Sequence, residues 1–244
     1  MKSVGFIGQM DCSGFVLCVA RLLEALNKKV IYIDATKEQK TRYTVPIILT
    51  ANRQEQYVTQ YDRVEVAVGF NNILELKKYM FSKGEDFNDF DYVIIVTDRE
   101  EMCEEYDFKS ANNLFFATSF DRYHLRRSID LLKFVCETKR REDTSARLNV
   151  TKVLSYTELK SADNKYIDRL ADEVPVDWNK EITLSYDDGD FSAYIQNQYL
   201  NKIDIKNLSK QTKEGILEIV SQISGEDKEK IRKVAKNVER LAKF

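Results

Sequence analysis

The sequence predicts an α/β fold with three layers, in which helices cover both faces of a mostly parallel central sheet and the C-terminal end is helical. Segments with strand and helix patterns alternate along the chain. Tyr92–Val96 is a continuous apolar run, which is typical of a strand buried on both faces of a parallel sheet. The 244 residues include only two prolines and eight glycines, so few residues interrupt regular structure.

Apolar periodicity predicts each element of the first half in turn. After residue 34 we expect a polar, loop-rich stretch before the alternation resumes. The predicted elements are a strand at Val4–Ile7, a helix at Phe15–Leu26, and strands at Val30–Asp34 and Val64–Val68, followed by a helix at Asn71–Phe81 and the strand Tyr92–Val96.

The second half continues the alternation and then becomes helical. We treat residues 1–222 as one domain and residues 223–244 as an amphipathic C-terminal helix. The predicted elements are strands at Leu114–Thr118, Val150–Leu154 and Ile182–Tyr186, and helices at His124–Glu137, Tyr166–Val174, Phe191–Leu200, Leu208–Ile223 and Asp227–Phe244.

Composition excludes several classes of protein. The net charge of -2 gives no global attraction for nucleic acid, and no apolar run is long enough to span a bilayer. The chain enters its first strand without the layout of a signal peptide. None of the four cysteines forms a CxxC pair, so we expect reduced thiols in a cytoplasmic protein, without structural zinc or disulfides. Asp187–Asp190 lacks the spacing of a calcium loop and is predicted to cap a helix.

The loop Gly8–Gly14 follows the first strand at the position where a phosphate-binding loop would lie. It contains no lysine, and no Ser or Thr follows its last glycine. In a parallel sheet, sites form beyond the carboxyl ends of the strands, where this loop and Val96–Asp98 would meet. The layout therefore suits a nucleotide-handling fold whose catalytic groups are missing.

The order of motifs resembles the ParA/MinD superfamily of deviant Walker A ATPases over residues 1–222. Gly8–Gly14 and the helix behind it look like the family's KGGxxKT loop. Lys28–Asp34 is similar to its strand that ends in an aspartate, and Phe90–Thr97 looks like its FDYIIID strand. Asn112–Ala117, which leads into Ser119–Leu132, is similar to the strand and helix that follow.

Departures from the family pattern decide the expected activity. Gln9 stands at the signature lysine and Gly14 at the phosphate-contacting lysine. Phe15 replaces the hydroxyl residue that binds Mg²⁺ and is expected to add bulk there, and Val96 replaces the acid. Phosphoryl transfer depends on positioned charge, so these losses predict a degenerate P-loop domain, a pseudo-ATPase with no catalytic residues and no metal site.

A vestigial nucleotide loop would comprise Gly8, Gln9, Asp11, Ser13, Gly14 and Asp34. Backbone N–H groups at a helix N-terminus attract phosphate without a lysine, but Asp11 would repel a triphosphate. We therefore expect weak or absent binding of ATP or ADP. Asp34 could orient water and metal, as the resemblance implies, or could stabilise a turn. Asp98 is expected to cap the turn after its strand.

Other polar candidates are weaker. His124 is expected on the surface of a helix, since no Ser or Cys beside it forms a nucleophile motif. Arg126–Arg127 and Lys139–Arg141 flank one helix and could hold DNA, although a solvated helix face is the simpler interpretation.

The tail repeats apolar residues at Ile231, Val234, Val238 and Leu241 among many lysines and arginines. This pattern is typical of a helix that binds a membrane surface or a partner, and MinD-like proteins end in such a helix. Packing on its own domain or on a second subunit is the alternative.

The expected function is that of a non-catalytic ParA/MinD-like localisation or assembly factor for a larger machine. It is nearest to the atypical pilus-localisation members called TadZ. The resemblance implies a homodimer, a protein partner, and a cytoplasmic location that could be peripheral to the inner face of the membrane. One alternative is an active partition or positioning ATPase, which would need a lysine from elsewhere to reach the loop. Another is a DNA-associated plasmid-maintenance protein.

Overall fold

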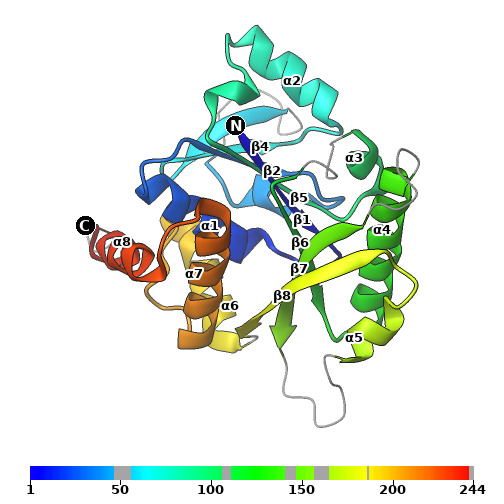
Figure 1. The fold of residues 1–244 in the computed structure, drawn as a ribbon. Helices are drawn as coiled ribbons and strands as arrows, with labels where there is room; N and C mark the ends of the chain where they lie inside the picture. Colours follow the sequence, from blue (N-terminus) through cyan, green and yellow to red (C-terminus); the bar gives the residue numbers. More distant parts are fainter. Residues whose placement is uncertain (47–55, 106–110, 141–146, 157–164, 186, 242–244) are drawn as a thin grey trace.

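The computed structural model describes residues 1–46, 56–105, 111–140, 147–156, 165–185 and 187–241. These residues form an eight-stranded sheet with the order β3-β4-β2-β5-β1-β6-β7-β8 (Figure 1). Only the pair β3 and β4 is antiparallel, so the predicted fold class is confirmed. The strands are β1 (Lys2–Ile7), β2 (Val30–Asp34), β3 (Tyr57–Tyr61), β4 (Val64–Val68), β5 (Tyr92–Thr97), β6 (Asn113–Ser119), β7 (Leu148–Tyr156) and β8 (Val176–Ser185).

Helices cover both faces of the sheet. Side chains of α1, α7 and α8 are buried in the core on one face, and those of α2, α3, α4 and α5 in the core on the other. The α-helices are α1 (Ser13–Ala25), α2 (Ile73–Ser82), α3 (Glu100–Glu105), α4 (Arg122–Arg140), α5 (Lys165–Leu170), α6 (Asp188–Leu200), α7 (Lys210–Ser224) and α8 (Lys228–Leu241), with short 3-10 helices η1 (Lys40–Tyr43) and η2 (Phe87–Asp89).

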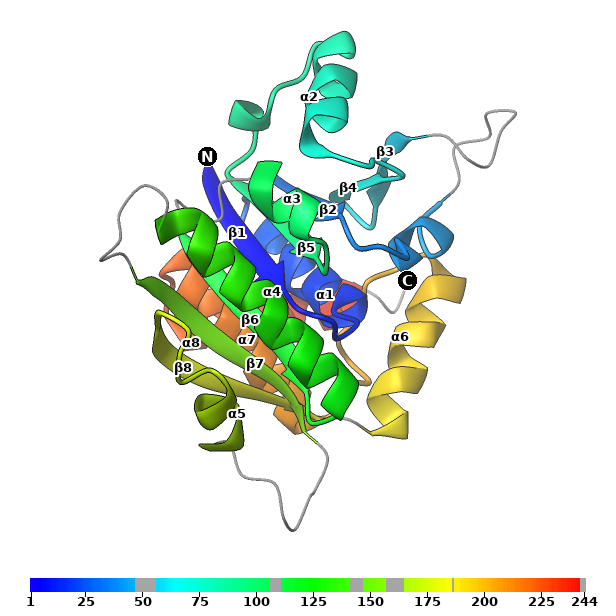
Figure 2. The same cartoon turned by 90° about the vertical axis from the view of Figure 1, so that its right-hand side faces the viewer.

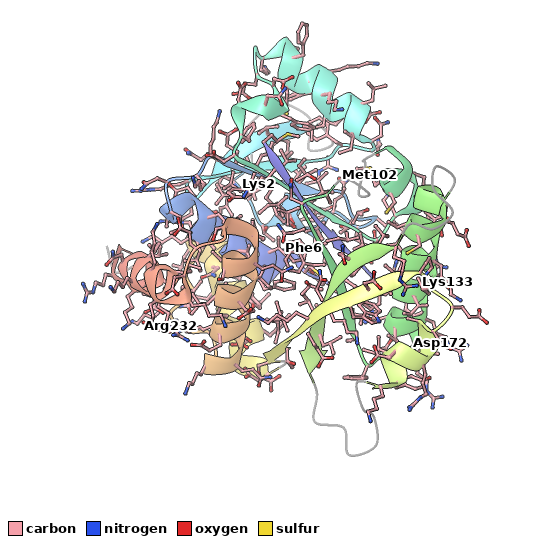
Figure 3. All side chains as sticks on the ribbon, viewed as in Figure 1. Lys2, Phe6, Met102, Lys133, Asp172 and Arg232 are labelled. Carbon is pink, nitrogen blue, oxygen red and sulfur yellow. The ribbon has the colours of Figure 1, made fainter. Side chains whose placement is uncertain are left out.

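The central strands supply both cores because their side chains alternate between the faces. In β5, Ile94 and Val96 point to the α1 side, whereas Val93 and Ile95 point to the α4 side. Phe6 of β1 lies at the centre of the molecule (Figure 3). The continuous apolar run of β5 thus reflects burial on both faces.

Three expectations about the elements were wrong. The polar stretch after residue 34 contains η1 and the edge strand β3. Strand β8 begins at Val176 rather than Ile182, and α5 ends at Leu170 rather than Val174. Strands β3 and β8 lie at the two edges of the sheet, so their exposed faces carry polar residues and their apolar signal is weak. Tyr186, the predicted end of the β8 segment, lies outside the described residues.

The C-terminal helices pack into the same core as α1. Ile231 and Val238 of α8 are buried there, and Arg232 pairs with Glu214 of α7 at 2.6 Å on the outer side (Figure 3). The predicted boundary at residues 222 and 223 falls inside α7. Within the described part of the chain, no helix is both long and apolar enough to cross a membrane.

Candidate functional site at the carboxyl end of the sheet

The loop from β1 to α1 begins at a position that only glycine fits. Gly8 has a φ of +143°, and a Cβ there would lie 1.9 Å from the carbonyl oxygen of Ala117. The Gly8 N–H donates to the carbonyl of Thr97 at 3.1 Å. The close approach to β6 and the bond to β5 account for this glycine without any phosphate.

Gln9 ties the loop to its neighbours. Its backbone N–H donates to the Ser128 hydroxyl of α4 at 2.9 Å, and its side-chain amide donates to the carbonyl of Asp98 at 3.1 Å. The residue at the family's signature-lysine position therefore anchors the loop to α4 and to the end of β5.

Asp11 lies at the N-terminal end of α1. Its Oδ1 accepts hydrogen bonds from the N–H of Ser13 at 3.0 Å and from the Ser13 hydroxyl at 2.7 Å. Its Oδ2 lies 3.3 Å from Nζ of Lys40, which comes from η1. Burial raises the pKa of Asp11, but the bonds from Ser13 and the charge of Lys40 outweigh burial and hold the pKa below its usual value. The charge of Asp11 in turn raises the pKa of Lys40.

Gly14 faces an aromatic ring. A Cβ at Gly14 would lie 2.7 Å from a ring carbon of Tyr194, which belongs to α6. Figure 2 shows α6 in yellow beside the start of α1. The space into which any side chain at position 14 would extend is thus filled by Tyr194.

Phe15 follows the loop at the start of α1 and lines a cavity beside the loop. Phe15 is buried and packs edge-on against Phe6, with the ring centroids 5.9 Å apart. It is one of the core residues of α1. Val96, at the position of the family's acid, is also buried in this core.

Asp34 is buried and stabilises a turn. Oδ1 accepts from the N–H of Thr36 at 3.1 Å and from its hydroxyl at 2.6 Å, and Oδ2 accepts from the N–H of Thr41 at 2.9 Å. These bonds occupy both oxygens, so the structure supports the turn rather than the metal interpretation. Asp98 likewise accepts from the N–H of Lys37 at 2.7 Å, while burial raises its pKa.

A cavity of about 780 Å³ opens beside the loop, lined by the start of α1, by α6 and by the ends of β6, β7 and β8. Sequence reasoning missed two features of it. Tyr194 closes over Gly14, and Lys40 reaches the loop from η1. A lysine 26 or more residues from the loop gives no local sequence signal, and Tyr194 is even more remote; only tertiary packing brings them here.

Ser119 and His124 meet at the cavity wall. The Ser119 hydroxyl lies 3.2 Å from Nδ1 of His124, and Asp121 Oδ1 lies 4.0 Å from the same nitrogen. In a catalytic triad the acid and the serine contact opposite ring nitrogens, so this arrangement is not a relay. Asp121 also accepts from the N–H of His124 at 3.0 Å, which is a helix cap. Across the described residues, no group of three or more potential ligands is arranged to hold a metal ion.

The two surface predictions have different outcomes. Arg127 is exposed and lies 3.9 Å from Asp130 of the same helix, while the side chains of Lys139–Arg141 lie outside the described residues. In the tail, Ile231 and Val238 are buried against the protein's own core, which corrects their assignment to a membrane or partner surface. Val234 is half-buried, and the side chain of Leu241 is not described.

Comparisons with known proteins address the fold. No protein-family model matches this sequence, and no curated protein matches it. The fold is similar to that of solved structures, and three of them each cover 93% or more of this chain and 97% or more of their own. They are a chain of the MinC:MinD cell-division complex of Aquifex aeolicus (TM-score 0.57, 11% identity), a Cyanothece McdA variant bound to ATP (0.54, 14%) and a ParA family ATPase of Chlorobium tepidum (0.53, 13%). At these identities the likeness shows the fold.

Proposed function

We propose that this chain, which has the ParA/MinD fold, is a non-catalytic localisation or assembly factor. The observation that carries the proposal is the position of the Asp11 carboxylate. It occupies the N-terminal end of α1, held by Ser13 and Lys40, where the fold would otherwise receive a phosphate. The loop's anion position is thus filled by an anion of the chain itself.

Charge argues against a triphosphate in this loop. The depressed pKa of Asp11 keeps its carboxylate ionised at neutral pH. A phosphate entering the same position would meet that negative charge and would have to displace Lys40 and Ser13 from it. Repulsion and lost hydrogen bonds both weaken nucleotide binding.

Catalysis lacks its other groups as well. Tyr194 fills the space beside Gly14, Phe15 and Val96 are core residues, and both oxygens of Asp34 accept hydrogen bonds within a turn. Since phosphoryl transfer is catalysed by positioned charge and metal, these side chains supply little that would accelerate hydrolysis.

An active positioning ATPase is the second candidate, and Lys40 is the observation that favours it. This lysine comes from outside the loop and reaches it, as that function requires. A similar fold has been solved with ATP. If Lys40 served a nucleotide, Lys40→Met would abolish hydrolysis of Mg·ATP, whereas the neighbouring Glu38→Gln would retain it.

Hydrolysis of Mg·ATP by the purified chain separates the two candidates. We expect no phosphate release above background from the wild type. Turnover would contradict the non-catalytic proposal. Homodimerisation and DNA binding stay predictions, which light scattering and a salt-dependent DNA titration would test.

A further inference from the structure

The 780 Å³ cavity is lined by one strongly exposed aromatic residue, Phe191 of α6. Other apolar lining residues include Met10, Phe15, Leu17, Leu184 and Ile195. An apolar hollow with an exposed aromatic side chain is typical of protein-binding surfaces.

Phe191 lies at the mouth of the cavity. It lines the cavity and is also 67% exposed, although it belongs to a helix whose next turn carries the half-buried Tyr194 and Ile195. An apolar side chain from a partner could therefore contact Phe191 at the mouth and continue inward along α6. A cavity of this volume accommodates a few side chains or one small ligand.

The charged groups of the lining favour a cation. The lining contains four aspartates and one lysine. Lys40 is already paired with Asp11, and Asp190 accepts hydrogen bonds from Ser209 and Thr212. The remaining two carboxylates, Asp121 and Asp187, are exposed at the ends of α4 and α6.

Both exposed carboxylates are ionised at neutral pH. Asp121 accepts from the N–H of His124, and Asp187 accepts from the N–H of Asp190, and these bonds hold each pKa below its usual value. Two anions beside an apolar hollow attract a segment that carries both positive charge and apolar side chains.

We propose that this cavity, with Phe191 at its mouth, forms the docking site for a basic, apolar segment of a partner protein. The inference rests on the proposed function, because a localisation factor that holds no nucleotide leaves the cavity free for a partner. Phe191 is the apolar anchor, and Asp121 and Asp187 attract lysine or arginine side chains of the segment.

A binding assay with designed peptides tests the site. The probe is a fluorescein-labelled peptide of alternating leucine and lysine, added to the full chain and followed by anisotropy. We expect it to bind at least about tenfold more tightly than peptides of leucine with glutamate or of serine with lysine. Equal binding of the leucine–glutamate peptide would overturn the proposal.

Two matched pairs of variants locate the binding. Phe191→Ser should weaken binding of the leucine–lysine peptide about tenfold, whereas Phe81→Ser, at an even more exposed position on α2, should leave it unchanged. Asp121→Asn with Asp187→Asn should weaken it several-fold and reduce its salt dependence, because Asn caps a helix as well as Asp does. Asp86→Asn, at the start of η2, is the charge control. Identical affinities within either pair would overturn the proposal.

Two further measurements separate this proposal from its alternatives. Light scattering that shows a dimer, converted to monomer by Phe191→Ser, would assign the surface to a second copy and overturn the inference. Displacement of the bound peptide by micromolar Mg·ATP would contradict the claim that Asp11 fills the anion position of the loop, while supporting the cavity as a docking site. Peptide binding that ATP leaves unchanged supports both.

Discussion

The ring of Tyr194 lies against the backbone of Gly14, so closely that a Cβ on Gly14 would meet a ring carbon at 2.7 Å. The contact joins α6 to the second residue of α1 and covers the loop at its helical end. Burial also raises the pKa of the Tyr194 hydroxyl, so the ring stays neutral. Gly14 therefore serves the packing of α6 against α1.

Gly14→Ala should destabilise the protein by about 1–3 kcal/mol, because the added methyl group collides with Tyr194. The sign of the change in unfolding free energy is informative, because replacing glycine by alanine ordinarily stabilises a helix. Urea denaturation measures the change. In a Tyr194→Ala background the same substitution should cost close to nothing, and an equal cost in both backgrounds would refute the contact.

Asp34→Ala should lower the free energy of unfolding by about 2–4 kcal/mol, because the N–H groups of Thr36 and Thr41 lose their acceptor inside the protein. Thr36→Val, which removes one donor, should cost about 1 kcal/mol. Thermal and urea unfolding measure both variants. Unchanged stability of the Asp34→Ala protein would contradict the structural role of Asp34 in the turn.

The interaction of Asp11 with Ser13 and Lys40 should depend on pH. A carboxylate whose folded pKa lies below the usual 3.8 stabilises the protein above that pH, and this contribution is lost as the pH falls through the folded value. The wild type should exceed Asp11→Asn in stability at pH 6 by less than about 1 kcal/mol, since Asp11 is half-exposed. The difference should shrink below pH 3.8. A difference that grew with acidification would contradict the interaction.

Ile231→Ala in α8 should cost about 2–4 kcal/mol, because its side chain is completely buried beside α1 and α7. Val234→Ala on the same helix should cost less than about 1.5 kcal/mol, because Val234 is only half-buried and the substitution removes fewer atoms. Denaturation of both proteins supplies the comparison. The contrary result would be a wild type that sediments with anionic vesicles and an Ile231→Ala variant that is equally stable but no longer sediments. That result would place this helix on a membrane instead.

The fold could be predicted from the sequence because its central elements carry strong periodic signals. The run Tyr92–Val96 belongs to a strand buried on both faces, and the apolar spacing of α7 follows one face of a helix. Helix α1 is apolar over a continuous run because it is buried on all sides. Strand β3 was missed because an edge strand is only half-buried, and its sequence Tyr-Val-Thr-Gln-Tyr lacks a continuous apolar run.

The site was harder to predict because alignment to a motif gives the position of a residue but not the contacts of its side chain. Phe15 was expected to add bulk beside the loop, and its edge-on packing against Phe6 in the core could not be read from the motif. Asp11 was identified from the sequence as a charge that repels phosphate. Its partner Lys40 could not be identified, because the sequence of η1 carries only a weak signal for regular structure. The pairing of Ser119 with His124 depends on the turn between β6 and α4, which spacing alone does not define.

Calorimetric titration of ATP and ADP with Mg²⁺ into the purified protein tests the central claim most directly, namely that the carboxylate of Asp11 fills the anion position of the loop. The account predicts no binding heat for the wild type up to millimolar nucleotide, and measurable binding once Asp11→Asn removes the charge while Lys40 remains. Micromolar binding of either nucleotide to the wild type would contradict it.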